Sequence, residues 1–301
     1  MTVLEESSES LESSESLESS ESKARTLVEA LPYIRRFRNT VVVVKLGGEP
    51  LDDPTLARTV SEDLALLALV GISVVVVHGG GPQISRAMQE HGVEPQFLGG
   101  LRVTDDASME LVQRTLVGEI NSELVRRLNA AGAPAAGISG IDGGTIVAER
   151  TPGPHGEDLG RVGAVAEVRT DLLTSLLEGG FTPVLASLGV SSDGQTLNVN
   201  ADASAAAVAC ALGAEKLVYV TNVEGLYRDL GDPGSLVSEM KEDDLAALAP
   251  SLSSGMKPKA EAALAALGGG VSKVHILDGR VQHALLLEVF TSEGIGTQVL
   301  P

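Results

Sequence analysis

The chain has 301 residues, a formal net charge of −19 and only 2% aromatic residues, with no tryptophan. This length allows one large core or two lobes, which Val, Leu, Ile and Ala must fill. So acidic a chain, with no basic cluster, argues against nucleic-acid binding. No apolar run approaches the roughly 20 residues needed to span a bilayer. The lone Cys210 excludes an intrachain disulfide framework. Together these features favour a cytoplasmic enzyme without membrane or nucleic-acid partners.

The N-terminal part of the chain divides into two segments. Residues 1–22 contain no Lys or Arg, and within them residues 5–22 repeat Ser, Leu and Glu almost without variation. Because they have few apolar side chains and too much like charge to pack, we expect a disordered acidic tail. Apolar residues at helical spacing then predict a helix over 23–39, kinked at Pro32.

Two runs of four valines each lead into glycines. Val41–Val44 precedes Gly47 and Gly48, and Val74–Val77 precedes the three glycines 79–81. Such unbroken β-branched runs predict parallel strands buried on both faces. Glycine turns at their carboxyl ends let backbone N–H groups approach an anion at the edge where α/β sheets bind ligands. The pattern therefore indicates a phosphate-handling enzyme.

The rest of the sequence alternates between helical and strand patterns, which predicts an α/β fold with a mainly parallel sheet covered on both sides. Helices are expected near 54–70, 82–91, 106–131, 170–178, 202–212, 241–248 and 257–267. Further strands are expected at 181–188, 216–221, 273–277 and 297–300. The Gly- and Pro-rich stretch 138–168 is expected to form hairpins at one rim.

Several polar residues adjoin the predicted strand ends and helix starts. Lys45 is either a cation for a phosphoryl group or a snorkelling strand-end lysine. Arg102 either binds a carboxylate in bidentate fashion or is an ordinary surface arginine, and Lys259 lies at the start of an alanine-rich helix. Asp202 is either a plain N-cap or, with Asn198, part of a polar substrate site. The histidines lack metal-ligand spacing, and the Walker and dinucleotide-binding motifs are absent.

Five motifs in this order carry a family resemblance: Lys-Leu-Gly-Gly, His-Gly-Gly-Gly-Pro-Gln, Gly-Leu-Arg-Val-Thr-Asp, Asn-Val-Asn-Ala-Asp and Gly-Met-Lys-Pro-Lys. From about residue 24 to residue 301 the chain resembles the amino acid kinase family, most closely its acetylglutamate kinase branch. The resemblance implies a three-layer α/β/α sandwich with a mainly parallel central sheet. It also implies an amino-acid-binding and dimerisation lobe over 40–190 and an ATP-binding lobe over 191–301.

The activity that this resemblance implies is ATP-dependent phosphorylation of the side-chain carboxylate of N-acetyl-L-glutamate in arginine biosynthesis. Mg²⁺ would enter with ATP, arginine would act as feedback inhibitor, and the chain would form a homodimer or a hexamer of three dimers. Two alternatives stay open: a kinase for glutamate or an aminoadipate derivative, and an inactive arginine-binding protein of the same fold. A nicotinamide oxidoreductase is a more distant alternative.

The resemblance also assigns residues. It implies catalytic roles for Lys45, Lys259 and Asp202, and substrate binding by Gly80, Gly81, Arg102 and Asn198. It implies ATP binding by Gly48, Asn222, Gly225, Tyr227, Gly255 and Met256, although Asn222 stands where the family usually has an aspartate. It implies an arginine-inhibitor site formed by Tyr33, Lys216, His275, Glu288 and Gly294. It implies no dedicated metal ligands.

Overall fold

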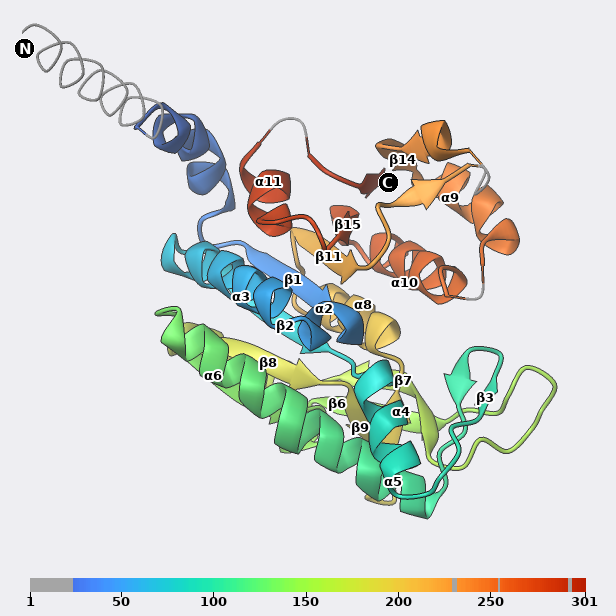
Figure 1. Ribbon diagram of the computed structural model, residues 1–301. Coiled ribbons are helices and arrows are strands. Elements are labelled where there is room, and N and C mark those ends of the chain that lie inside the picture. The colour runs from blue at the N-terminus through green and yellow to red at the C-terminus, as the bar shows by residue number, and fades with distance from the viewer. Residues whose placement is uncertain (1–23, 229–231, 254, 292–293) are drawn as a thin grey trace, which may run out of the picture.

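The computed structural model of the protein describes residues 24–228, 232–253, 255–291 and 294–301. The expected disorder of tail 1–22 lies outside these residues. Residues 24–37 are helical, Pro32 included, and this helix projects from the body of the molecule (Figure 1). No helix within the described ranges is long and apolar enough to cross a membrane.

An eight-stranded sheet forms the centre of the fold, in the order β14-β16-β15-β11-β1-β2-β8-β5. The strands from β15 to β5 run parallel, whereas β16 runs antiparallel to β15. The carboxyl ends of β1, β2, β8 and β11 therefore meet at one edge. The strands are β1 (Val41–Leu46), β2 (Ser73–His78), β5 (Ala135–Ser139), β8 (Thr182–Ala186), β11 (Lys216–Thr221), β14 (Glu239–Lys241), β15 (Lys273–Asp278) and β16 (Thr297–Leu300).

Helices cover both faces of the sheet (Figure 1), and two apolar clusters separate the layers. Successive side chains of a strand point to opposite faces, so Val42 and Val44 enter one cluster and Val43 the other. The first face carries α3 (Pro54–Leu69), α4 (Gly81–Glu90), α6 (Ser122–Ala130) and α11 (Ala284–Phe290). The second carries α7 (Asp171–Glu178), α8 (Ala201–Ala211), α9 (Glu242–Leu248) and α10 (Lys257–Gly268). The predicted three-layer α/β/α sandwich is confirmed.

Most predicted elements match the structure within a few residues, but three predictions were wrong in part. The helix expected over 106–131 is α5 (Asp106–Gln113) and α6 joined by a π-helical segment, Arg114–Asn121. The strand expected over 181–188 is divided into β8 and β9 (Leu188–Val190). Within the stretch expected to form hairpins, 138–139 belong to β5 of the main sheet, because this strand pairs in parallel with β8.

Several short elements were not predicted from the sequence. These are α2 (Gly48–Asp52), the hairpin β3 (Phe97–Leu98) and β4 (Leu101–Arg102), β10 (Thr196–Val199), the hairpin β12 (Leu226–Tyr227) and β13 (Leu236–Val237), β14 and α11. Elements of two to seven residues span too few periods for a pattern to be recognised.

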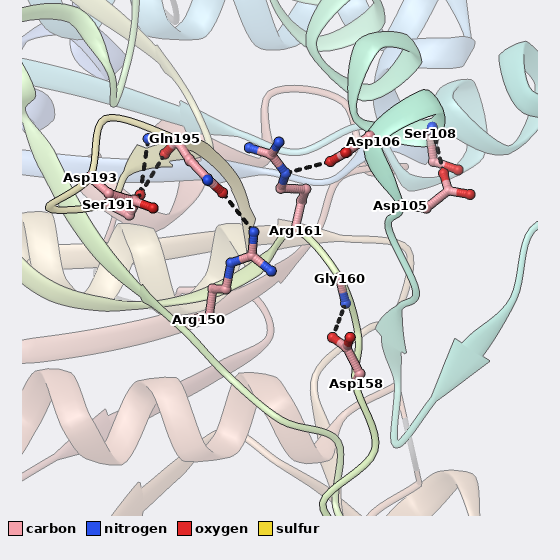
Figure 2. Close-up of polar contacts among 10 residues, drawn as sticks. All are labelled: Asp105, Asp106, Ser108, Arg150, Asp158, Gly160, Arg161, Ser191, Asp193 and Gln195. Carbon is pink, nitrogen blue, oxygen red and sulfur yellow. Dashed lines mark hydrogen bonds and ion pairs between the residues drawn. The ribbon is translucent and has the colours of Figure 1, made fainter.

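A second, smaller sheet lies beside the edge where the glycine turns are. Strands β6 (Ile146–Arg150) and β7 (Val162–Val168) form the predicted antiparallel hairpin and pair with β9 and β10 in a closed arrangement. Figure 2 shows side chains that hold this sheet together and in place. Arg150 donates to Gln195 at 2.6 Å, and Arg161 donates to Asp106 at the start of α5 at 2.6 Å. The small sheet is thus tied to the helices beside the main sheet.

Candidate active site

Lys45, Asp202 and Lys259 meet at the carboxyl edge of the main sheet. Lys45 shares the face of β1 that packs against α8, because it lies two residues beyond Val43. Its Nζ lies 2.7 Å from Oδ1 of Asp202, and Nζ of Lys259 lies 3.1 Å from Oδ2 of the same carboxylate. All three side chains are at most 15% exposed. One buried carboxylate therefore holds two ammonium groups at fixed positions.

Asn200, and not Asp202, caps the helix that carries this carboxylate. The side-chain oxygen of Asn200 accepts hydrogen bonds from the backbone N–H groups of Asp202 at 2.8 Å and Ala203 at 3.0 Å. The carboxylate of Asp202 is thus left free to bind the lysines. Its place in the first turn of α8 is favourable, since the helix dipole stabilises negative charge there. The alternative reading of Asp202 as a plain N-cap is wrong.

Burial and the neighbouring charges shift the pKa values of this group. Burial lowers the pKa of Lys45, the Asp202 carboxylate opposes that shift, and Lys259 adds to it. Burial alone would raise the pKa of Asp202, but the two lysines outweigh it and hold that pKa below its usual value. The carboxylate is therefore ionised at neutral pH, and it is the group that opposes the lowering of the Lys45 pKa.

Each glycine turn has N–H groups that find an acceptor in the sheet and others that find none among the described residues. Gly47 N–H donates to Val220 O and Gly79 N–H to Leu46 O, so each turn is anchored to the sheet by its first glycine. The N–H groups of Gly48, Gly80 and Gly81 have no backbone acceptor among the described residues. Such groups at helix starts form an anion-binding site.

The second turn needs a glycine at one position for steric reasons. A Cβ on Gly80 would lie 2.3 Å from Cδ1 of Ile120, whereas one on Gly81 meets nothing within 4 Å. Gly80 is therefore packed against the helix layer, while Gly81 faces open space.

Arg102 is a buried cation without a carboxylate partner among the described residues. Its guanidinium donates to Gly81 O and to Ser85 Oγ, both at 2.8 Å, and stacks on the ring of Phe97 at 4.6 Å. Burial lowers its pKa from the usual value for arginine, and no ion pair with a described residue offsets the charge. A buried guanidinium in this state is suited to an anion, and its planar fork matches a carboxylate; the role of Arg102 in substrate binding stays a prediction.

One cavity of about 200 Å³ brings most of the predicted substrate and catalytic residues together. Asn198 lies in its wall, placed by β10 and by a bond from its side chain to Thr104 Oγ1 at 3.2 Å. Sequence reasoning missed Ser187 and Phe97, which also line it. The residues already discussed that line the cavity are Lys45, Gly48, Gly80, Gly81, Arg102, Asn198, Asn200 and Asp202.

The residues assigned to ATP lie on three segments near the same edge. Asn222 directly follows β11, and Thr221 Oγ1 donates to its side-chain oxygen at 3.3 Å. Gly225 and Tyr227 belong to the turn and strand that follow, where a Cβ on Gly225 would lie 2.6 Å from Thr297 Oγ1. Gly255 and Met256 immediately precede α10, which carries Lys259. A nucleotide role for these residues stays a prediction.

A second cavity, of about 490 Å³, lies between the N-terminal helix and the β11–β15–β16 part of the sheet. Four of the five residues assigned to the arginine inhibitor line it: Tyr33, Lys216, Glu288 and Gly294. The fifth, His275, is fully buried behind the wall, with Nδ1 2.6 Å from Glu288 Oε1. All five are therefore neighbours in space.

The charges of the second cavity are mixed. The Glu288 carboxylate lies 3.9 Å from Lys216 Nζ, which in turn lies 4.7 Å from the centre of the Phe37 ring. Burial lowers the pKa of Lys216 to about 8. Arg36 and Lys273 supply further cations at the wall. An acid beside several cations matches a ligand that carries both a carboxylate and a positive group.

Sequence comparison places this architecture among known proteins. Residues 40–278 match the Amino acid kinase family. The acetylglutamate kinase of Acidothermus cellulolyticus is 49% identical over 286 residues, which cover 93% of this chain and 97% of that protein. The acetylglutamate kinase of Symbiobacterium thermophilum is 49% identical over 285 residues, covering 92% of this chain and 97% of that protein.

A solved structure gives the same picture. N-acetylglutamate synthase from Neisseria gonorrhoeae, determined with coenzyme A and N-acetyl-glutamate, superposes with a TM-score of 0.83 at 31% identity. The match covers 92% of this chain but 63% of the synthase, so this chain spans less than two thirds of that protein. The family match extends from β1 to β15 and includes both glycine turns and all three residues of the lysine–aspartate cluster. The chain belongs to the amino acid kinase family.

Proposed function

We propose that the protein is an ATP-dependent kinase that phosphorylates the side-chain carboxylate of N-acetyl-L-glutamate. The observation that carries this proposal is the cavity lined by Lys45, Asp202, the glycine turns and Arg102, with Lys259 bound to the same Asp202 carboxylate. Among the described residues, Arg102 has no counterion there. The near full-length identity of 49% to acetylglutamate kinases supports the choice of substrate. The product is an acyl phosphate, which would serve arginine biosynthesis.

The reaction needs positioning and positive charge more than proton transfer. The substrate carboxylate is already ionised at neutral pH, so its oxygen attacks the γ-phosphorus of ATP without a general base. The bond to the β-phosphate oxygen breaks, and its electron pair leaves with ADP. Lys45, Lys259 and the glycine N–H groups stabilise the negative charge on the phosphoryl oxygens, and Asp202 holds the lysines in place.

The two ends of the substrate are bound by different groups. Arg102 binds the α-carboxylate, and Asn198 lies across the same cavity for the acetylamino group. ATP binds along Asn222–Tyr227 and Gly255–Met256.

A divalent metal, which we assign as Mg²⁺, accompanies the nucleotide. The described part of the chain contains no group of three His, Cys, Asp or Glu side chains suited to a metal, and the Asp202 carboxylate is engaged by two lysines. A metal that enters with ATP would neutralise part of the negative charge of the phosphates.

A hydroxylamine trap for the acyl phosphate tests the activity and the substrate. The enzyme is incubated with ATP and Mg²⁺ and, separately, acetylglutamate, glutamate and an N-acetylated aminoadipate. We expect trapped product with acetylglutamate and little with the other two. Preference for another acceptor would assign the chain to that carboxylate, and no product from folded protein would favour an arginine-binding protein without turnover. A Lys45→Ala variant, expected to be folded and inactive, serves as control.

Arginine is the proposed ligand of the second cavity, where Glu288 would pair with its guanidinium and the lysines with its carboxylate. Millimolar arginine should raise the Tm and suppress turnover in the wild type. Glu288→Gln keeps the shape of the side chain but removes the charge, so it should abolish both effects and retain turnover. Inhibition that persists in this variant would place the arginine site elsewhere.

The N-terminal helix supports a proposed oligomer. Leu27 and Val28 are 70% and 63% exposed, and Leu31 follows on the same side of the helix. A second copy of this helix would cover these side chains and link dimers into a hexamer. Light scattering of the wild type and of a Leu27→Glu/Leu31→Glu variant checks this, with a fall from hexamer to dimer expected. We also propose a cytoplasmic location for the protein, on the basis of the sequence alone.

A further inference from the structure

The π-helical segment Arg114–Asn121 lies against the second glycine turn. π-Helical turns are uncommon and occur frequently at functional sites, and this one interrupts an otherwise regular helix. Leu116 Cδ2 and Ile120 Cδ1 lie 3.1 and 2.3 Å from the position that a Cβ on Gly80 would take. Leu116 also lines the substrate cavity. The segment thus restricts the conformation of the second glycine turn through its contacts with Gly80.

Asn121, the last residue of this segment, is a buried connector. Its amide Nδ2 lies 3.0 Å from Nε2 of His78, and it donates to the carbonyl oxygens of Val184 at 2.8 Å and Ile138 at 3.2 Å. Its side-chain oxygen packs so closely on Gly137 that a Cβ there would lie 2.1 Å from it. One side chain therefore contacts β2, β8 and β5 together.

His78 links Asn121 to the second glycine turn. It is fully buried, and burial lowers its pKa to about 4, so the ring is neutral at physiological pH. Since Nε2 accepts from Asn121, the ring proton is on Nδ1, which donates to Gly79 O at 3.1 Å. That carbonyl belongs to the peptide group that also contains the Gly80 N–H. Because a trans peptide is planar, holding the oxygen fixes the N–H in the opposite direction.

We propose that Asn121 and His78 are positioning residues that direct the Gly80 N–H toward the transferring phosphoryl group. Neither side chain lines the substrate cavity; they act through the Gly79–Gly80 peptide. This inference rests on the proposed phosphoryl transfer, and it holds for any carboxylate acceptor. The N–H must be aimed before the reaction, because a donor that has to reorient stabilises the transition state less.

Steady-state kinetics of four single variants test the proposal. Asn121→Ala and His78→Leu should lower kcat about 10- to 100-fold, with KM for both substrates little changed, because a small misplacement affects mainly the transition state. His78→Asn keeps a donor at the place of Nδ1 and should recover most of kcat. Asn129→Ala is the matched control: Asn129 links the same long helix to Ala135 at the opposite end of β5. It should leave kcat unchanged.

A double variant tests whether the two residues act together. If the two residues act through one another, Asn121→Ala/His78→Leu loses no more kcat than His78→Leu alone. Additive losses, a loss with Asn129→Ala equal to that with Asn121→Ala, or no rescue by His78→Asn would overturn the proposal.

The proposal also has a readout independent of turnover. The amide ¹H–¹⁵N resonance of Gly80 is followed by NMR while inorganic phosphate is titrated. It should shift in the wild type and much less in Asn121→Ala. This pattern in a protein that transfers no phosphoryl group would retain the inference and contradict the proposed function. Equal shifts in both proteins would contradict the inference.

Discussion

Replacement of Asp202 by Asn removes the charge that holds two buried lysines and changes little else in shape. Lys45 and Lys259 lie 2.7 and 3.1 Å from this carboxylate, and their side chains are 8% and 15% exposed. Removing one partner of a buried ion pair costs about 3–5 kcal/mol, because the remaining charge is left uncompensated. A typical domain has about 5–15 kcal/mol of stability, so Asp202→Asn should fold with a clearly lower urea midpoint.

The same substitution should alter the pH dependence of catalysis. The carboxylate raises the pKa of Lys45 against burial and against Lys259, so its loss lowers that pKa further. More Lys45 is then neutral at a given pH, and the remaining kcat should increase as the pH is lowered. At neutral pH we expect kcat to fall at least about 100-fold, the usual effect of losing a preorganised charge-stabilising group.

Urea unfolding and a pH–kcat profile between about pH 6 and 9 measure both effects. Asp106→Asn is the control, because Asp106 pairs with Arg161 but is 82% exposed; exposed pairs contribute about 0–1 kcal/mol. An Asp202→Asn protein as stable as this control, with wild-type kcat and an unchanged profile, would refute the assigned role of the carboxylate.

Three further predictions concern other groups of the site. Gly80→Ala puts a methyl group 2.3 Å from Ile120 Cδ1, and we expect urea unfolding to show a loss of about 1–3 kcal/mol; Gly81→Ala meets nothing within 4 Å, so an equal loss there would contradict the packing. Arg102→Lys loses the planar fork and should raise KM for acetylglutamate about tenfold or more, whereas an unchanged KM would remove Arg102 from carboxylate binding. Because the pKa of His78 is lowered from 6.5 to about 4, the unfolded chain binds a proton between these values that the native chain does not. The free energy of unfolding should therefore fall by up to about 3 kcal/mol as the pH drops from 6.5 to about 4. Urea unfolding at a series of pH values measures this fall, and a His78→Asn variant should not show it.

The central strands could be predicted from the sequence because their patterns are long and unambiguous. Four consecutive valines before Lys45, and again before His78, indicate buried parallel strands, and in the structure each valine run lies within such a strand, β1 and β2. The chemistry expected at the ends of these strands also followed from elementary arguments. The glycine turns lie at one edge because parallel strands place their carboxyl ends together.

Residue patterns alone could not predict which site residues lie close together in space. Lys259 lies 57 positions from Asp202 in the sequence, and only the family resemblance brought the two together. Asn121 gave no signal, because its role depends on a π-helical turn that the sequence does not distinguish from a regular helix. Asn200 was passed over as the cap, since two asparagines and an aspartate near a helix start are all acceptable N-caps.

The most direct test of the account is to follow an oxygen atom of the substrate. Acetylglutamate labelled with ¹⁸O in its side-chain carboxylate is incubated with ATP, Mg²⁺ and the enzyme, and the reaction is observed by ³¹P NMR. The account predicts an acyl phosphate resonance with the isotope shift of a P–¹⁸O bond, and one ADP formed for each acyl phosphate. No acyl phosphate resonance, with ADP and inorganic phosphate formed at the same rate with and without acetylglutamate, would mean that water is the acceptor, and would contradict the proposed carboxylate kinase.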